Sequence, residues 1–210
     1  MIAIAGADLV LSDRVHRGGS LLIDAGRIVA VESHAIDSLG IERVEHRGRY
    51  VVPGFVDVHV HGVCGHDTLD GGDAVAAIAR HLPRFGVTAF CPTTVACEPA
   101  VLTDVLGQVA YLRRHPDLRA ARVLTAHLES NFISPEFRGA QPAPCLRCPD
   151  AAAPDGTFSG LDILQVIAAH AASVGIVTVA PEVPGVLDLI PGLVASGHRV
   201  SLGHSAATFD

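Results

Sequence analysis

The pattern of hydrophobic and polar positions changes at residue 54. Over residues 1–53, short apolar runs alternate with turn residues, and no useful stretch has helical periodicity. Two of these runs, 21–23 and 27–31, flank a turn at 24–26, which predicts a β-hairpin. We therefore predict a small all-β part over residues 1–53.

Residues 54–210 have a different rhythm, in which short apolar runs alternate with helical segments. The predicted strands are 55–61, 87–93, 122–128, 176–180 and 199–203, and the predicted helices are 74–85, 99–115, 160–173 and 185–196. Asp73 and Ser159 are the predicted caps of the first and third helices. A long loop is expected over 130–159, and 205–210 resemble the start of a fifth helix. This alternation predicts an α/β domain built from βαβ units around a parallel sheet.

Length and charge narrow the class of protein. The chain has 210 residues, 15 Lys+Arg and 22 Asp+Glu, for a formal net charge of −7. A net acidic chain is not typical of nucleic-acid binders, and no apolar run reaches the roughly 18 residues of a membrane span. A complete (β/α)₈ barrel takes about 250 residues, so this length cannot hold one beside a second domain.

The cysteines indicate the compartment. Five are present, an odd number, and the N-terminus has no secretory signal, so we expect a reduced, cytoplasmic setting. Cys145 and Cys148 form a CxxC in a proline-rich segment, with no second ligand pair nearby. Because a structural zinc site needs such a pair, we favour the interpretation in which these two residues have no metal or redox role.

The first predicted strand of the α/β domain contains a His-x-His pair. Side chains alternate between the two faces of a strand, so Asp57, His59 and His61 share one face. Two imidazoles on one face at the carboxyl end of a strand can hold a divalent ion. The alternative is a pair of partly buried histidines with hydrogen-bond partners. We favour the metal site, with Asp57 as a possible support for the pair.

Two further candidates stand at the carboxyl ends of predicted strands. Glu129 follows a largely apolar run, where an unpaired carboxylate is costly, and His204 follows the fifth strand. Taken alone, Glu129 could equally be the first solvated loop residue. Four such residues at strand ends favour a shared site for Zn²⁺, Fe²⁺ or Mn²⁺. His127 is interpreted as a core histidine, with support of the metal ligands as the alternative.

Five segments resemble a known family. Residues 52–62 (VPGFVDVHVHG) are similar to the first-strand signature of the amidohydrolase superfamily. Within it, the chain resembles the N-acetylglucosamine-6-phosphate deacetylase family over nearly its whole length. The segments that carry this second resemblance are 86–94 (GVTAFCPTT), 127–129 (HLE) with 138–140 (RGA), 179–182 (VAPE) and 200–208 (VSLGHSAAT).

The resemblance implies an incomplete metal-dependent (β/α)₈ TIM barrel, with about five of eight strands, over 54–210. Residues 1–53 would be part of a small β-sandwich. It also implies one or two divalent ions, an amino-sugar phosphate substrate, release of acetate, and a homodimer for a full-length form. By motif, Glu129 and His204 match metal ligands, His59 and His61 match the pair that allows a second metal, and Ala140 and Gln141 match substrate contacts.

The chain departs from the family pattern in its loop. Ser130 and Asn131 stand where the family usually has Gly-Pro, and Gln141 stands where it usually has His. The family's next metal-ligand histidine and its acid/base aspartate would lie beyond Asp210, so we assign no catalytic residue. The sequence therefore predicts a truncated, N-terminal part of a deacetylase. A different N-acyl amidohydrolase and a non-catalytic metal-binding fragment are the alternatives.

Overall fold

The computed structural model describes residues 1–34, 40–153 and 156–208. The chain divides into two compact units, Met1–Gly54 and Phe55–Asp210. Within the described part of the chain, no helix has the length and apolar character needed to cross a membrane.

The first unit is a five-stranded sheet. Its strands are β1 (Ile2–Val10), β2 (Val15–Asp24), β3 (Arg27–Glu32), β4 (Glu42–Glu45) and β5 (Tyr50–Val51). β1 and β2 are antiparallel, and β2 and β3 form the predicted hairpin. Its turn residues Ala25 and Gly26 both have positive φ, at 45° and 75°, as a type I′ turn requires. β4 and β5 then join β1 in parallel.

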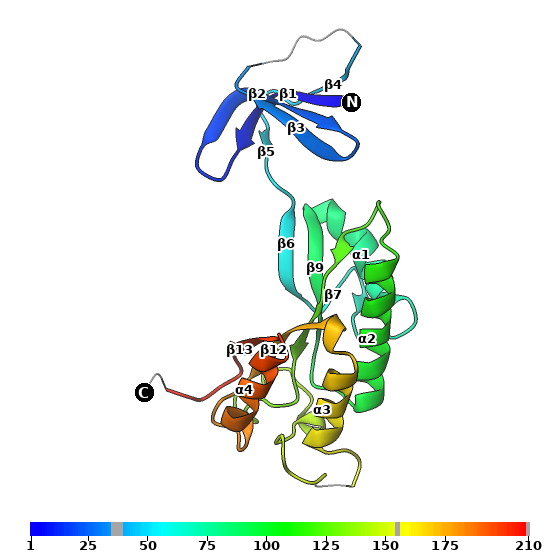
Figure 1. Cartoon of the computed structure of the whole chain (residues 1–210), viewed down its shortest axis with the longest axis vertical. Coiled ribbons are helices and arrows are strands. Elements are labelled where there is room, and N and C mark those ends of the chain that lie inside the picture. Colours follow the sequence, from blue (N-terminus) through cyan, green and yellow to red (C-terminus); the bar gives the residue numbers. More distant parts are fainter. Residues whose placement is uncertain (35–39, 154–155, 209–210) are drawn as a thin grey trace. The chain divides into compact units, whose positions relative to one another are not determined.

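The second unit is built on a curled parallel sheet (Figure 1). Its strands are β6 (Phe55–Val60), β9 (Val87–Thr94), β10 (Arg122–Val123), β11 (Ala126–Glu129), β12 (Val174–Val179) and β13 (Arg199–Leu202). β9 lies between β6 on one side and β10 and β11 on the other, and β12 and β13 extend the sheet from β11. This order is the expected succession of five parallel strands, and it confirms the α/β class.

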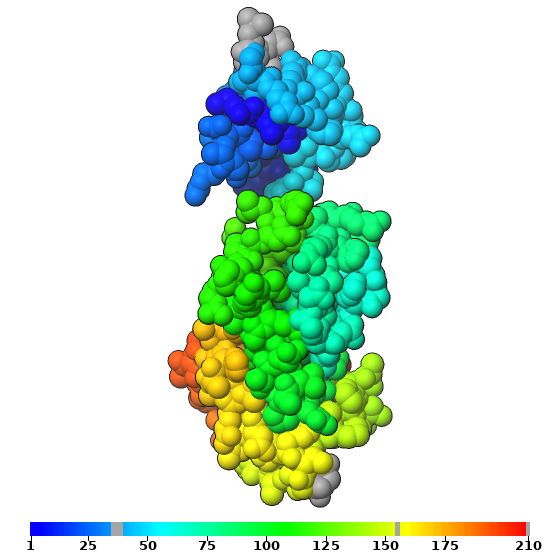
Figure 2. Space-filling view, turned by 90° about the vertical axis from the view of Figure 1, so that its right-hand side faces the viewer, coloured from blue at the N-terminus to red at the C-terminus, as the bar shows by residue number. Residues whose placement is uncertain are grey.

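Helices cover the outer side of this sheet. They are α1 (Ala74–His81), α2 (Pro99–Arg114), α3 (Gly160–Ala169) and α4 (Val186–Ala195), with 3₁₀ turns at Leu82–Phe85, Ala143–Cys145 and Ala171–Ser173. α1, α2 and α3 lie along one side of the sheet, and their atoms form a continuous face (Figures 1 and 2). Between sheet and helices lies a core that includes the fully buried Phe90, Ile78 and Leu106.

Two predicted elements are interrupted. The helix expected over 74–85 stops at His81, because Pro83 has no N–H to donate to the Ala79 carbonyl; that carbonyl accepts instead from the Ala121 N–H at 2.8 Å. The strand expected over 122–128 is split into β10 and β11. Arg122 pairs with Ala89 but His127 pairs with Thr93, so one extra residue bulges out between them.

Three further expectations about helices were wrong. Asp73 precedes α1 but its side chain makes no capping hydrogen bond. The helix expected over 160–173 ends at Ala169 and is followed by a 3₁₀ turn. Residues 205–208 are not helical, and the Ser205 hydroxyl and the Ala206 N–H bind the Glu182 carboxylate. Residues 209–210 lie outside the described part of the chain.

Ser159 does cap α3 as predicted. Its hydroxyl accepts from the Asp162 N–H, and the Asp162 carboxylate accepts from the Ser159 N–H at 2.7 Å, which completes a capping box. The Ser159 N–H and hydroxyl both donate hydrogen bonds to the Asp162 carboxylate. These two bonds lower the pKa of Asp162, against an opposing effect of burial. The box therefore connects the end of the long loop to the first turn of α3.

We expect Ser159→Ala to lower the free energy of unfolding by about 1 kcal/mol, because it removes the cap. The folded-state pKa of Asp162 is lowered, so the box stabilises the fold at neutral pH, and its effect is lost as the pH falls through that pKa. Urea unfolding at pH 7 and at acidic pH measures both effects. The exposed Ser196 at the end of α4 provides the control Ser196→Ala, and an equal loss in both variants would contradict a capping role.

Candidate metal centre

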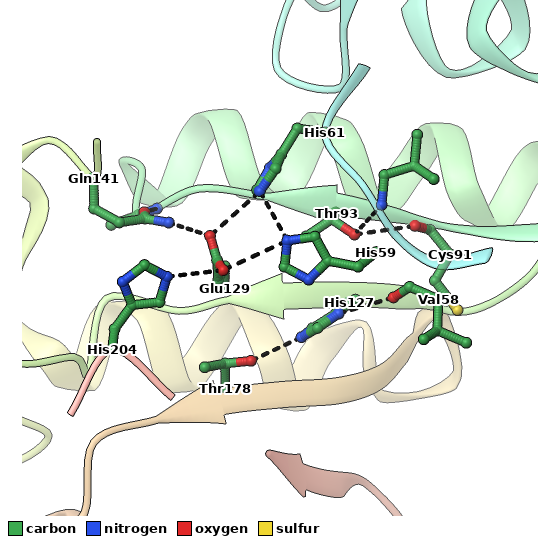
Figure 3. Close-up of polar contacts among 12 residues, drawn as sticks. Val58, His59, His61, Cys91, Thr93, His127, Glu129, Gln141, Thr178 and His204 are labelled. Atoms are coloured by element: carbon green, nitrogen blue, oxygen red, sulfur yellow. Dashed lines mark hydrogen bonds and ion pairs between the residues drawn. The ribbon is translucent and has the colours of Figure 1, made fainter. Parts of the chain in front are cut away.

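Four sequence-predicted residues meet at the carboxyl end of the parallel sheet (Figure 3). His59 lies in β6 and His61 just after it, Glu129 ends β11, and His204 follows β13. One ligand atom from each of His59, His61 and Glu129 lies within 4.8 Å of the others. The structure therefore brings together side chains from three segments that are 68 or more positions apart in the chain, as their places at strand ends predicted.

The carboxylate of Glu129 is the centre of the group. Its Oε1 lies 2.9 Å from His204 Nε2 and 3.5 Å from His59 Nε2, and its Oε2 lies 3.3 Å from His61 Nε2. The two Nε2 atoms of His59 and His61 are 3.1 Å apart. Glu129 is 8% exposed, so it is a buried carboxylate surrounded by imidazoles and not a solvated loop residue.

The His-x-His pair is held by its backbone. The His59 N–H donates to Asp57 Oδ1 at 3.1 Å and the Val60 N–H donates to Thr93 Oγ1 at 2.9 Å. These bonds replace regular pairing with β9, whose register with β6 shifts between Asp57 and Val60. Asp57 thus supports the pair through the main chain of His59. Thr93, which the sequence interpretation missed, fixes the strand between the two rings.

Glycine is required directly after the pair. Residues Gly62–Val63 (β7) and His66–Asp67 (β8) form a short antiparallel ribbon. A Cβ on Gly62 would lie 2.1 Å from the His66 carbonyl oxygen, so only glycine allows the chain to turn away here. The turn leaves the His61 ring in the site.

His204 is anchored from the long loop. Its φ is 51°, an uncommon value for a residue other than glycine, and its carbonyl accepts from the Ser134 N–H at 3.0 Å. Its ring Nδ1 lies 2.9 Å from the Phe137 carbonyl, to which it donates. Burial lowers the pKa of His204, but the bonds to Phe137 and Glu129 outweigh this effect and raise the pKa above its ordinary value.

His127 faces the neighbouring strands. Its Nδ1 donates to the Val58 carbonyl at 2.9 Å, and its Nε2 accepts from the Thr178 hydroxyl at 2.7 Å. Burial lowers its pKa, against a smaller opposite effect of the Val58 bond. Both ring nitrogens are therefore used to tie β6, β11 and β12 together, which agrees with the interpretation as a core histidine.

The donor set fits a divalent cation. A carbonyl bond at Nδ1 of His204 leaves its Nε2 as the nitrogen that faces Glu129, the arrangement common in metal-binding histidines. His61 Nδ1 is buried without a hydrogen-bond partner among the described residues, so Nε2 is the nitrogen through which this ring makes its polar contacts. Imidazole nitrogens and carboxylate oxygens that converge in this way could hold a cation between them, and such ligands suit Zn²⁺, Fe²⁺ or Mn²⁺.

Ser130 and Asn131, which depart from the Gly-Pro of the family pattern, hold the backbone of the chain through their side chains. The Ser130 hydroxyl donates to the Thr178 carbonyl at 2.5 Å and accepts from the Phe132 N–H at 3.2 Å. The Asn131 amide donates to the carbonyls of Cys97 and Cys145 at 2.8 and 2.7 Å. Both side chains are 3% exposed. They hold the loop to its neighbours and do not extend into the site.

Ala140 and Gln141 lie in the same loop but differ in exposure. Ala140 is exposed, whereas Gln141 is 2% exposed. The Gln141 amide donates to Glu129 Oε2 and accepts from the Ala96 N–H at 2.7 Å. A substrate contact by these two residues stays a prediction, while the bond from Gln141 to Glu129 is a feature that the sequence did not indicate.

The cysteines lie outside the site. All five are free, and Cys97 and Cys91 are buried whereas Cys64 is exposed. Burial, with smaller effects of Cys145 and Glu98, raises the pKa of Cys97 to about 12. Burial also raises the pKa of Cys145. Thiols with raised pKa values are poor nucleophiles and poor ligands at neutral pH.

Comparisons with known proteins agree with this site. No family model matches the chain. It is 40% identical over 208 residues to the N-acetylglucosamine-6-phosphate deacetylase of Mus musculus, which covers 92% of this chain and 48% of the mouse protein. The chain belongs to the N-acetylglucosamine-6-phosphate deacetylase family. It spans about half the length of the curated relatives it matches.

Two further comparisons place the chain within this deacetylase family. A Mycobacterium smegmatis N-acetyl-D-glucosamine-6-phosphate deacetylase variant, solved in complex with N-acetyl-D-glucosamine-6-phosphate, matches with a TM-score of 0.81 and 28% identity. The match covers 100% of this chain and 51% of that one. The N-acetylgalactosamine-6-phosphate deacetylase of Escherichia coli O157:H7 is 32% identical over 176 residues, covering 83% of this chain and 44% of that protein. The expected partial amidohydrolase barrel is thereby confirmed.

Cysteine reactivity tests the described packing. We expect iodoacetamide at pH 8 to modify Cys64 quickly and Cys97 only after the chain unfolds, because Cys97 is buried and its pKa is about 12. Mass spectrometry of peptides over time measures both rates, with modification in urea as the control. Equal rates for Cys64 and Cys97 in the folded chain would show that the segment between β9 and α2 is open.

Proposed function

We propose that this chain carries the metal-binding part of an enzyme that hydrolyses the N-acetyl group of N-acetylglucosamine 6-phosphate. The products are glucosamine 6-phosphate and acetate. The observation that carries the proposal is the convergence of His59, His61 and His204 on the buried carboxylate of Glu129. Family membership supplies the reaction, and the geometry supplies the residues.

His59, His61, Glu129 and His204 would hold one or two divalent ions. When bound, such an ion polarises the amide carbonyl and lowers the pKa of water from 15.7 to about 7. The side chains of this chain set up that chemistry. Glu129 presents two oxygens toward three rings, and the Phe137 carbonyl fixes which nitrogen of His204 faces them. His127, bound at both nitrogens, holds the strands in register.

Amide hydrolysis also needs a group that carries a proton to the leaving amine. We assign no such catalytic residue among residues 1–210, and the resemblance puts this aspartate on a later strand of the barrel. Activity is thus proposed for the whole protein. A cytoplasmic setting and a homodimer stay predictions.

The sugar is the least constrained part of the proposal. The M. smegmatis complex supports an N-acetylglucosamine 6-phosphate substrate, and the E. coli relative makes the galactosamine epimer the second candidate. The loop departures had suggested a different N-acyl substrate. Since Ser130 and Asn131 bind backbone carbonyls of β12, of Cys97 and of the loop itself, they give that alternative no support.

Metal binding tests the proposal. We expect the chain to bind Zn²⁺, and we expect Glu129→Gln and His204→Ala to weaken binding by more than the ~10–100-fold that loss of a supporting residue costs. Isothermal titration calorimetry measures the affinities. The exposed His115, which binds Tyr111 on α2, provides the control His115→Ala, and this variant should bind as the wild type does.

A second arm addresses the sugar. Calorimetry on the Zn²⁺-loaded chain compares N-acetylglucosamine 6-phosphate with its galactosamine epimer, and we expect tighter binding of the former. Tighter binding of the epimer would reverse the substrate assignment. A wild-type chain that binds no Zn²⁺, or Glu129→Gln binding it equally well, would overturn the metal centre itself.

A further inference from the structure

Gln141 contacts the central carboxylate of Glu129 through its side-chain amide. Its side chain spans two partners that come from different strands: Glu129 at the end of β11 and the N–H of Ala96, two residues after β9. Gln141, Ala96 and Glu129 are 2%, 1% and 8% exposed. This bridge therefore lies in the interior.

The orientation of the Gln141 amide follows from its partners. A backbone N–H can only donate, so the atom 2.7 Å from the Ala96 nitrogen must be Oε1. The Nε2 group consequently faces Glu129 and donates to Oε2. One amide group thus meets an acceptor and a donor, and a hydrocarbon of the same shape could satisfy neither.

The backbone on both sides of this amide is also fixed. The Gln141 N–H donates to the Arg138 carbonyl at 3.0 Å, and the Arg138 guanidinium donates back to the Gln141 carbonyl at 3.0 Å. Gly139, with φ +58°, makes the turn that these two bonds close. Gln141 therefore enters the site from a closed loop, not from a free segment.

The bridge decides how Glu129 presents its oxygens. The last torsion of a glutamate side chain is broad and roughly two-fold, so its partners decide the plane of the carboxylate. The Gln141 donor on Oε2 favours the plane in which Oε2 faces His61 and Oε1 faces His204 and His59. We propose that Gln141 is a positioning residue, which sets the carboxylate plane of Glu129 for the metal.

This proposal rests on the proposed metal function and adds a role to it. It differs from a contact with the sugar, because it concerns the bonds that the two polar atoms of the Gln141 side chain make within the chain. Substitution at 141 should therefore change the metal site before it changes recognition of the sugar.

The test measures metal binding and the metal's environment. Co²⁺ is added to the chain, its affinity is measured by calorimetry, and its visible absorption spectrum reports the ligand geometry. Gln141→Met keeps the length of the side chain but neither hydrogen bond. We expect its Co²⁺ affinity to fall by about 10–100-fold and its absorption band to shift.

The chain offers a matched control. The Gln108 side chain on α2 also accepts from a backbone N–H and donates to a carboxylate, but its partners lie on α1 and α2. It accepts from the Val75 N–H at 3.3 Å and donates to Asp104 at 2.9 Å. Gln108→Met should leave Co²⁺ affinity and spectrum unchanged. Gln141→His should recover at least part of the affinity, since a neutral imidazole offers one donor and one acceptor. Circular dichroism establishes that each variant is folded.

The outcomes separate the two proposals. A wild-type chain that binds no Co²⁺ overturns both. Wild-type binding with an unchanged Gln141→Met variant overturns the positioning role alone. An equal loss of Co²⁺ affinity in Gln108→Met would also overturn the positioning role, because it would indicate a general effect on stability. A folded Gln141→His variant that binds Co²⁺ no better than Gln141→Met would overturn it as well.

Discussion

The site depends on burying one carboxylate. Removing an ionised carboxylate from water costs several kcal/mol unless charges and hydrogen bonds replace the water. At Glu129 three imidazole nitrogens and one amide take the place of water. Each comes from a different segment of the chain, apart from the His59–His61 pair. Glu129 can therefore be buried as a carboxylate only in a fold that brings these segments together at one edge of the sheet.

The parallel sheet brings these segments together, because the carboxyl ends of its strands lie at the same edge. Hydrogen bonds of polar side chains then adjust the strands at this edge. Thr93 and Asp57 take over backbone donors of β6, and His127 connects β6 to β12. The bulge between β10 and β11 changes the register just before Glu129. Irregular pairing is thus concentrated where side chains must be aimed, as at many functional sites.

The sequence predicted the four residues of the candidate site and the support from Asp57, but not the contacts of Thr93 and Gln141. Period-two alternation and the ends of strands are local properties, so His59, His61, Glu129 and His204 could be predicted. The contact between Ala96 and Gln141 joins residues 45 positions apart through an irregular loop, and no local pattern encodes it. The bonds from Ser205 and Ala206 to the Glu182 carboxylate likewise join distant residues, and no local pattern indicates them.

The neutrality of Gln141 has a consequence for this carboxylate. A lysine or arginine at 141 could also donate to Oε2, but its full charge would compensate Glu129 and compete with a cation for it. An amide donates while leaving the negative charge of Glu129 available. Gln141 can therefore orient the carboxylate without neutralising it. The negative charge of Glu129 stays available for the proposed metal.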